Sequence, residues 1–182
     1  DRKSARFYHY LDHYRQTGEG PNHIIYHSLF KNGWLYVTAR NGFWRIHPER
    51  NEFQLLSKER LFLTFEMDSR GYIWLAADFK LYRMKTGNWD QLECIKLEGG
   101  TTAGTRITRI MEAADGTVYI ATLGDGVYSY SHETGNWKHY TKKNSHLLSD
   151  FCYNLAETHM NNILITCDEG FSIYSPFNYS IY

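Results

Sequence analysis

Apolar residues recur along this chain in short, strand-length runs rather than at helical spacing. Val118–Ala121 is apolar at consecutive positions, which is typical of a strand that is covered on both faces. The segment that follows, Tyr128-Ser129-Tyr130, alternates between large and small side chains, as in a strand with one wetter face. Aromatic residues make up 16% of the chain and favour pleated, half-buried surfaces. The pattern therefore predicts an all-β fold.

This strand pattern occurs four times. The aligned segments are Asn32–Ala39, Arg70–Ala77, Asp115–Thr122 and Met160–Cys167. Their anchors, Gly33, Gly71, Gly116 and Asn161, are 38, 45 and 45 residues apart. The glycine in the first three copies supplies the positive φ of a tight hairpin turn. We interpret these glycines as turn residues and not as phosphate binders.

Each copy contains four segments that are predicted to be strands. An apolar strand precedes each anchor, and a third strand follows the second one, as in Gly126–Tyr130. An aromatic residue then begins an outer strand: Phe53, Trp89, Trp137 and Tyr179. Four strands in a repeat of about 45 residues are the signature of a propeller blade. The sequence predicts a partial β-propeller of about four four-stranded antiparallel blades, at residues 22–56, 60–97, 105–142 and 150–182.

The N-terminal segment adds one further strand to this prediction. Arg6–Tyr10 is similar to Asn136–Tyr140, which lies in a predicted outer strand. We therefore expect an orphan outer strand at residues 6–14, within one partial propeller that spans residues 1–182. Because four blades leave the usual larger ring open, we expect further blades or a second copy of the chain to cover the open ends.

Charge and hydropathy exclude some partners. Lys plus Arg (20) equals Asp plus Glu (20), so no long-range field attracts nucleic acid or an anionic membrane. No apolar run reaches the 18 residues of a membrane span. We expect neither nucleic-acid binding nor membrane contact from this segment.

The three cysteines leave two interpretations open. Cys152 and Cys167 face each other across a hairpin that is predicted to turn at Thr158–Asn161. They form either a disulfide or a pair of small buried thiols, and we favour the thiols. Cys94 has no predicted partner.

The third copy also carries a family resemblance. Asp115–Thr122, followed by Gly126-Val127-Tyr128, resembles the two-component-regulator propeller repeat. The segment from Trp137–Thr141 to Leu147–Asp150 resembles the linker between blades of that family. Such repeats build the periplasmic sensor region of hybrid two-component systems (histidine kinase/response regulator), which are typical of gut Bacteroidetes.

The resemblance implies a function that spacing alone does not show. It implies a non-catalytic, periplasmic sensor segment that responds to glycan-derived oligosaccharides, in a parent protein anchored in the inner membrane and ending in a histidine kinase. The alternatives are a propeller enzyme, such as a polysaccharide or lactone lyase, and a protein-binding scaffold. The repeats lack the Gly-His and Trp-Asp signatures of WD-repeat scaffolds.

If this segment binds an oligosaccharide, we expect the ligand contacts to lie in the loops. In propellers, the loops between second and third strands share a face with the loops that lead into the next blade. Polar or charged side chains in the former loops are our candidate ligand contacts: Arg40, Asn41, Asp78, Asp125, Asp168 and Glu169. The glycine-rich segment 99–104 has the composition of a mobile lid.

We expect no catalytic, metal or cofactor site. His9 and His13, like His23 and His27, are spaced as zinc ligands on a helix, but both pairs lie in segments predicted as strand or loop. Most acidic residues fall at predicted turns, where Asp stabilises the backbone locally.

Overall fold

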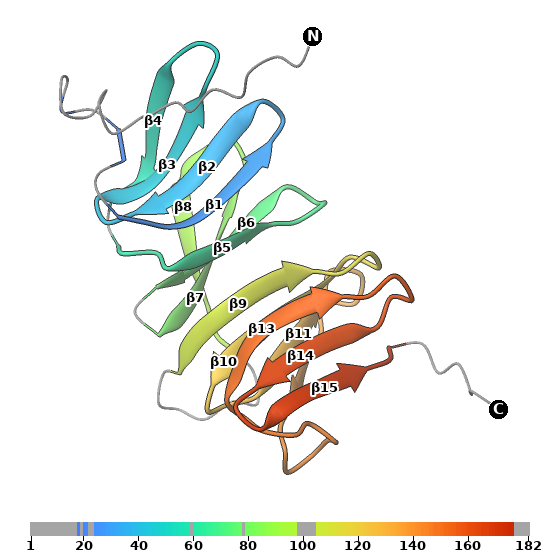
Figure 1. Ribbon diagram of the computed structural model, residues 1–182. Helices are drawn as coiled ribbons and strands as arrows, with labels where there is room; N and C mark the ends of the chain where they lie inside the picture. The colour runs from blue at the N-terminus through green and yellow to red at the C-terminus, as the bar shows by residue number, and fades with distance from the viewer. Residues whose placement is uncertain are drawn as a thin grey trace, which may run out of the picture. The chain divides into compact units, whose positions relative to one another are not determined.

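The computed structural model describes residues 18, 20–21, 24–58, 60–77, 79–97 and 105–176. These residues form fifteen β-strands (Figure 1), and no helix capable of crossing a membrane occurs among them. The chain divides into two compact units, residues 1–62 and 63–182. Each unit is described by itself.

The first unit contains one antiparallel sheet, blade 1. Its strands are β1 (Ile25–Lys31), β2 (Trp34–Ala39), β3 (Gly42–His47) and β4 (Glu52–Ser57), paired in that order. The turn between β1 and β2 has positive φ at both Asn32 (52°) and Gly33 (80°), as a two-residue hairpin loop requires. Phe43 of β3 is fully buried and its ring packs near those of Tyr36 and Phe62.

The second unit contains three antiparallel sheets. Blade 2 consists of β5 (Thr64–Met67), β6 (Tyr72–Ala77), β7 (Lys80–Lys85) and β8 (Asn88–Ile95). Blade 3 consists of β9 (Arg106–Glu112), β10 (Thr117–Leu123), β11 (Val127–Ser131) and β12 (Trp137–Tyr140). Blade 4 contains β13 (Cys152–Glu157), β14 (Ile163–Cys167) and β15 (Gly170–Tyr174). Strands within each sheet are neighbours in chain order.

The predicted fold class, an all-β partial propeller of antiparallel blades, is confirmed. Within the second unit the first strands of successive blades lie side by side, β5 with β9 and β9 with β13 (Figure 1). Two predicted strands, the fourth strand of blade 4 near Tyr179 and the orphan strand at 6–14, lie outside the described residues.

The core of the second unit lies between its blades. One buried cluster, which includes Trp74, Ile110 and Tyr128, joins blades 2 and 3. A second cluster, which includes Tyr119 and Leu155, joins blades 3 and 4. Strands β6 and β10 are buried at consecutive positions because they contribute side chains on both faces, as their apolar runs predicted.

Strand β14 behaves differently from the other second strands. Its burial alternates along the strand, because one of its faces has no blade packed on it among the described residues. Phe171 and Ile173 of β15 are also exposed, at 63% and 59% of their surface. Among the described residues, blade 4 therefore has an exposed apolar face.

One glutamate links blade 3 to blade 2, and another links blade 4 to blade 3. Glu112, the last residue of β9, accepts hydrogen bonds from the backbone N–H and the hydroxyl of Ser69, both 2.7 Å. Glu157, the last residue of β13, accepts one from the N–H of Ala114 at 2.8 Å. Both contacts join the end of one first strand to the hairpin turn of the blade before it. They therefore form one repeated inter-blade contact, which the sequence comparison did not single out.

Replacing Glu112 with alanine is expected to destabilise the chain by about 1 kcal/mol, since it removes two charge-assisted hydrogen bonds that are partly exposed to solvent. The same change at Glu133, an exposed glutamate in the β11–β12 turn, is expected to stay within about 0.5 kcal/mol. Urea unfolding of both variants measures the difference. Equal stabilities for the two variants would show that the inter-blade contact contributes nothing.

Candidate functional site

The loops that were predicted to share one face do meet in the second unit. The backbone N–H groups of Gly124 and Gly126, in the β10–β11 loop, both donate to the carbonyl of Asp150, at 2.9 and 3.0 Å. The hydroxyl of Thr105, at the entrance to blade 3, donates to the carbonyl of Leu123 at 2.6 Å. Linkers between blades and second-to-third-strand loops therefore lie together around blades 3 and 4.

Asp125, a predicted ligand contact, is buried in this face. Its carboxylate accepts a hydrogen bond from the hydroxyl of Tyr128, and its carbonyl oxygen lies 2.8 Å from Nε2 of His139. The rings of Tyr128 and His139 stack with 4.1 Å between centroids. Burial, followed by the hydrogen bond to Asp125, raises the pKa of Tyr128, so the phenol stays protonated as a donor. Through these contacts Asp125 stabilises the conformation of its own loop.

The other predicted contacts are distributed over both units. Asp168 and Glu169 are exposed in the β14–β15 turn, and Glu169 forms an ion pair with Lys142 at 3.2 Å. In the first unit Arg40 is exposed, whereas the side chain of Asn41 donates to the Gly20 carbonyl and accepts from the Trp44 indole. Asp78 and the predicted lid at 99–104 lie outside the described residues.

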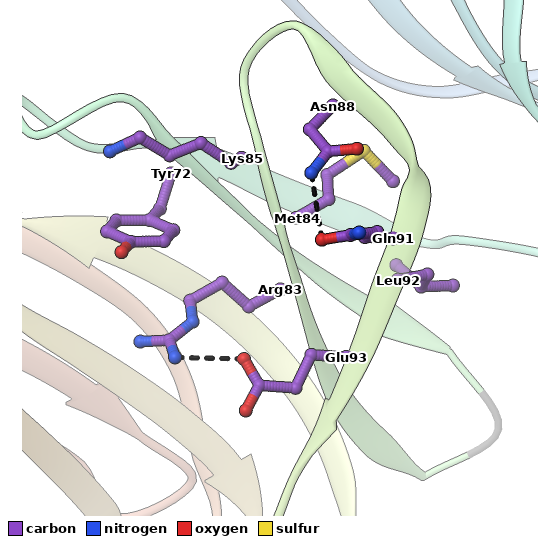
Figure 2. A pocket seen from close by; sticks show the side chains of 8 residues that line it. All are labelled: Tyr72, Arg83, Met84, Lys85, Asn88, Gln91, Leu92 and Glu93. Carbon is purple, nitrogen blue, oxygen red and sulfur yellow. Dashed lines mark hydrogen bonds and ion pairs between the residues drawn. The ribbon is translucent and has the colours of Figure 1, made fainter.

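A pocket of about 300 Å³ opens on the outer strands of blade 2 (Figure 2). We call it the rim pocket, and it is lined by Tyr72, Arg83, Met84, Lys85, Asn88, Gln91, Leu92 and Glu93. The pairing of β7 with β8 shifts register between Arg83 and Lys85. Such an irregularity bends a strand and re-aims its side chains, so the pocket forms where the outer pair departs from regular pairing.

Two cationic side chains of the rim pocket, Arg83 and Lys85, lie against the ring of Tyr72. The Arg83 guanidinium lies 4.7 Å from the Tyr72 ring centroid and pairs with Glu93 at 2.9 Å. The Lys85 ammonium lies 4.0 Å from the same ring centroid. Asn88 donates to Gln91 at 2.8 Å. Burial opposes the charged form of Arg83, but hydrogen bonds to Glu93 and Tyr130 outweigh it and raise the pKa of the guanidinium.

The chemistry of the rim pocket suits a polar ligand with several hydroxyl groups. Arg83 donates, Glu93 accepts and the amides do both, whereas the Tyr72 ring already contacts Arg83, Lys85 and His132. Our sequence reasoning missed this pocket because it searched the loops and not the strands. The available signal was Arg83 and Lys85 two residues apart, since such residues lie on the same face of a strand.

A second cavity, of about 350 Å³, lies between blades 3 and 4. Tyr119, Tyr140 and Tyr174 line it together with apolar side chains, and the Tyr140 hydroxyl donates to that of Tyr174 at 3.1 Å. Burial raises the pKa of Tyr119 and of Tyr174, so both phenols are neutral. Polar residues line the same cavity, namely Asn144, Ser145, His146, Ser172 and Ser175, so its lining is mixed.

One aspartate–histidine pair is also buried in the second unit. Asp68 Oδ2 lies 2.7 Å from His132 Nε2, and the two side chains are 0% and 6% exposed. Neither side chain reaches a cavity named above. The pair joins the β5–β6 turn of blade 2 to the end of β11 in blade 3. Among the described residues no three His, Cys, Asp or Glu side chains gather in a way that would hold a metal ion.

These features define a propeller segment with a pocket of mixed polar and apolar lining on one blade. No protein-family model and no curated protein matches the sequence. The fold is similar to that of the extracellular domain of BT4673 from B. thetaiotaomicron, a protein assigned to a one-component or hybrid two-component system. The TM-score is 0.70 at 21% identity, over 91% of this chain and 23% of that one.

Two further structures bear on the alternatives. The extracellular domain of BT3049, assigned to a hybrid two-component system of the same organism, has a TM-score of 0.63 at 14% identity, over 84% of this chain and 20% of that one. A catalytically inactive virginiamycin B lyase from Staphylococcus aureus, solved with quinupristin, has a TM-score of 0.62 at 13% identity, over 85% of this chain and 56% of that one. At these identities the similarity establishes the fold. The chain spans between a fifth and a quarter of the two B. thetaiotaomicron domains.

Proposed function

We propose that this chain is a non-catalytic part of the periplasmic sensor region of a hybrid two-component signalling protein, which is anchored in the inner membrane and responds to glycan-derived oligosaccharides. The observation that carries the proposal is the blade fold shared, over most of this chain, with two extracellular domains assigned to signalling systems. The repeat around Asp115–Thr122, which resembles the two-component-regulator propeller repeat, supports the same class.

The rim pocket supports a role in ligand binding. Its donors and acceptors are held by contacts within blade 2, Arg83 by Glu93 and by the Tyr72 ring, so they are preorganised for hydroxyl groups. Asp125, one of the predicted ligand contacts in the second unit, is buried and already bound by Tyr128 and His139. We therefore place the first candidate for ligand contact at the rim pocket and not at Asp125.

We also propose that further blades of the parent protein cover the open face of blade 4. Tyr153, Phe171 and Ile173 expose 50%, 63% and 59% of their surfaces there, and soluble proteins rarely leave such side chains together in water. In the two preceding interfaces a glutamate binds the hairpin turn, at Ser69 and at Ala114. An added blade with a glutamate at the end of its first strand would bind the turn at Thr158–Asn161 in the same way. A second copy of the chain is the alternative cover.

The second candidate function is a propeller lyase. The fold similarity to virginiamycin B lyase favours it, as does the presence of a buried Asp68–His132 pair. Against it stands the position of that pair, which is enclosed between blades and opens into neither pocket. If the chain is instead a protein-binding scaffold, we expect it to bind none of the sugars.

Calorimetric titration with a panel of neutral and acidic glycan oligosaccharides, followed by chromatography of the recovered sugar, separates these functions. We expect at least one oligosaccharide to bind to the extracellular region that contains this chain and to be recovered intact. Arg83→Gln is expected to weaken that binding by about tenfold, the loss of one charge-assisted hydrogen bond.

The matched control is Lys143→Gln, which removes an exposed positive charge in the linker after blade 3 and should leave affinity unchanged. Shortened or unsaturated products would contradict the sensor and support the lyase. Equal affinity of the Arg83 variant and the natural chain would exclude the rim pocket but leave the sensor proposal intact.

A further inference from the structure

Two of the three cysteines face each other directly in blade 4. Cys152, the first residue of β13, is the cross-strand partner of Cys167, the last residue of β14. Both side chains are buried, both are free thiols, and their sulfur atoms lie 3.8 Å apart. Cys94, on β8, is exposed and free.

This facing pair is specific to blade 4. The corresponding partners are Ile107 and Thr122 in blade 3, and Ile25 and Ala39 in blade 1. In blades 1 and 3, ordinary apolar or hydroxyl-bearing side chains therefore fill the corresponding positions. Two of the three cysteines in 182 residues nevertheless lie opposite each other in one sheet. Side-chain packing alone does not explain why both positions are cysteine.

We propose that Cys152 and Cys167 are a disulfide-forming pair that covalently joins β13 to β14. Cys152 and Cys167 are Cα partners at the end of the ladder, beside a register shift between Cys152 and Asn154. Cross-strand partners have Cα atoms about 4.5–5.5 Å apart in a regular antiparallel pair, which is within the range that disulfides span. The sulfur atoms need to approach from 3.8 Å to about 2.0 Å, a movement that side-chain rotation supplies.

The oxidant is a disulfide of low molecular weight or of a thiol-oxidising protein. The thiolate of one cysteine attacks that disulfide, forms a mixed disulfide and releases one thiol. The second thiolate then attacks the mixed disulfide and releases the second thiol. The chain loses two protons and two electrons, and the oxidant takes them up and is reduced to two thiols. The periplasmic location proposed above would supply such an oxidant, because disulfides form in that compartment.

Burial determines when the reaction takes place. Desolvation raises the pKa of the Cys152 thiol, and the thiolate is the attacking species. The folded chain is therefore expected to react slowly, and the bond forms during folding or in a local opening of blade 4. Once formed, the same burial shields the bond from reductants.

The bond would fix the end of blade 4 that approaches blade 3. Cys152 lies two residues after Asp150, whose carbonyl binds the β10–β11 loop, and Cys167 precedes the exposed pair Asp168–Glu169. A covalent link at this place holds the linker and the β14–β15 turn in one arrangement. The disulfide therefore stabilises the loop face on which ligand contacts were predicted.

The test is refolding of the reduced chain in a mixture of reduced and oxidised glutathione, followed by alkylation of free thiols and mass spectrometry. We expect one alkylated cysteine, Cys94, and a chain two hydrogens lighter than the reduced form. Trypsin leaves both partners in one peptide, because no Lys or Arg follows Lys143. Cleavage after Glu157 separates them, and the two fragments should remain linked until a reductant is added.

Two controls make the result specific. Cys94→Ser should retain the link, whereas Cys167→Ser should abolish it and leave Cys152 free to be alkylated. The thermal midpoint of the oxidised chain should exceed that of the reduced chain by about 5–10 °C, because the bond closes the loop between Cys152 and Cys167 and so restricts the unfolded chain. Three alkylated cysteines after refolding, or a link that involves Cys94, would overturn the proposal.

Discussion

Replacing Asp68 with alanine is expected to destabilise the chain by about 3–5 kcal/mol, which is a large share of the stability of an ordinary domain. The carboxylate is fully buried and holds four donors. Oδ1 accepts from the backbone N–H groups of Arg70 and Tyr72, at 3.0 and 2.7 Å, and Oδ2 binds the Trp74 indole at 2.8 Å and the His132 ring at 2.7 Å. Without the carboxylate these buried groups lose their partner, and the link between blades 2 and 3 is lost.

Asp115→Ala is the matched control. Asp115 lies in the corresponding turn of blade 3, is exposed, and accepts one local hydrogen bond from the Thr117 N–H at 2.9 Å. We expect a loss of about 0.5–1 kcal/mol for it. Urea unfolding, followed by tryptophan fluorescence and far-UV circular dichroism, measures both variants. Similar losses at the two positions would mean that Asp68 does not join the blades.

Replacing Gly126 with alanine is expected to cost at least about 3 kcal/mol, because it combines backbone strain with overpacking. Gly126 has a φ of 66°, and a Cβ placed there would collide with the carbonyl oxygen of Tyr140. The backbone of β12 has to move to relieve this contact, since a carbonyl is not a flexible side-chain end. The β10–β11 loop, which binds the linker at Asp150, would be displaced with it.

Gly116→Ala separates strain from collision. Gly116 has a similar φ of 79°, but its added Cβ would meet nothing within 4 Å, so only the left-handed backbone is penalised, by about 1 kcal/mol. Thermal unfolding of the two variants gives the comparison. If Gly116→Ala were as damaging as Gly126→Ala, the close approach of β12 to this loop would not be what restricts position 126.

The predictable part of the fold was local in sequence. Gly71 and Gly116 have the positive φ that their turns required, and Asn161 adopts it at 57° without being glycine. The apolar run Val118–Ala121 is buried on both faces. These features follow from neighbouring residues, so a repeat of short patterns was sufficient to predict the blades.

Contacts between distant residues could not be predicted in the same way. Asp68 and His132 are 64 residues apart, and only the packing of two blades brings them together. Asp125 had the sequence context of an exposed loop, but Tyr128 and His139 close over it. The rim pocket lies at a register shift between Arg83 and Lys85, which the periodicity of a regular strand does not predict.

The sequence of the coding region that follows Tyr182 tests the sensor assignment most directly. We expect more repeats of about 45 residues, each with a glutamate at the end of its first strand, followed by an apolar helix of about 20 residues and a histidine kinase. A stop codon immediately after Tyr182, or a catalytic domain of another class in place of the kinase, would contradict it.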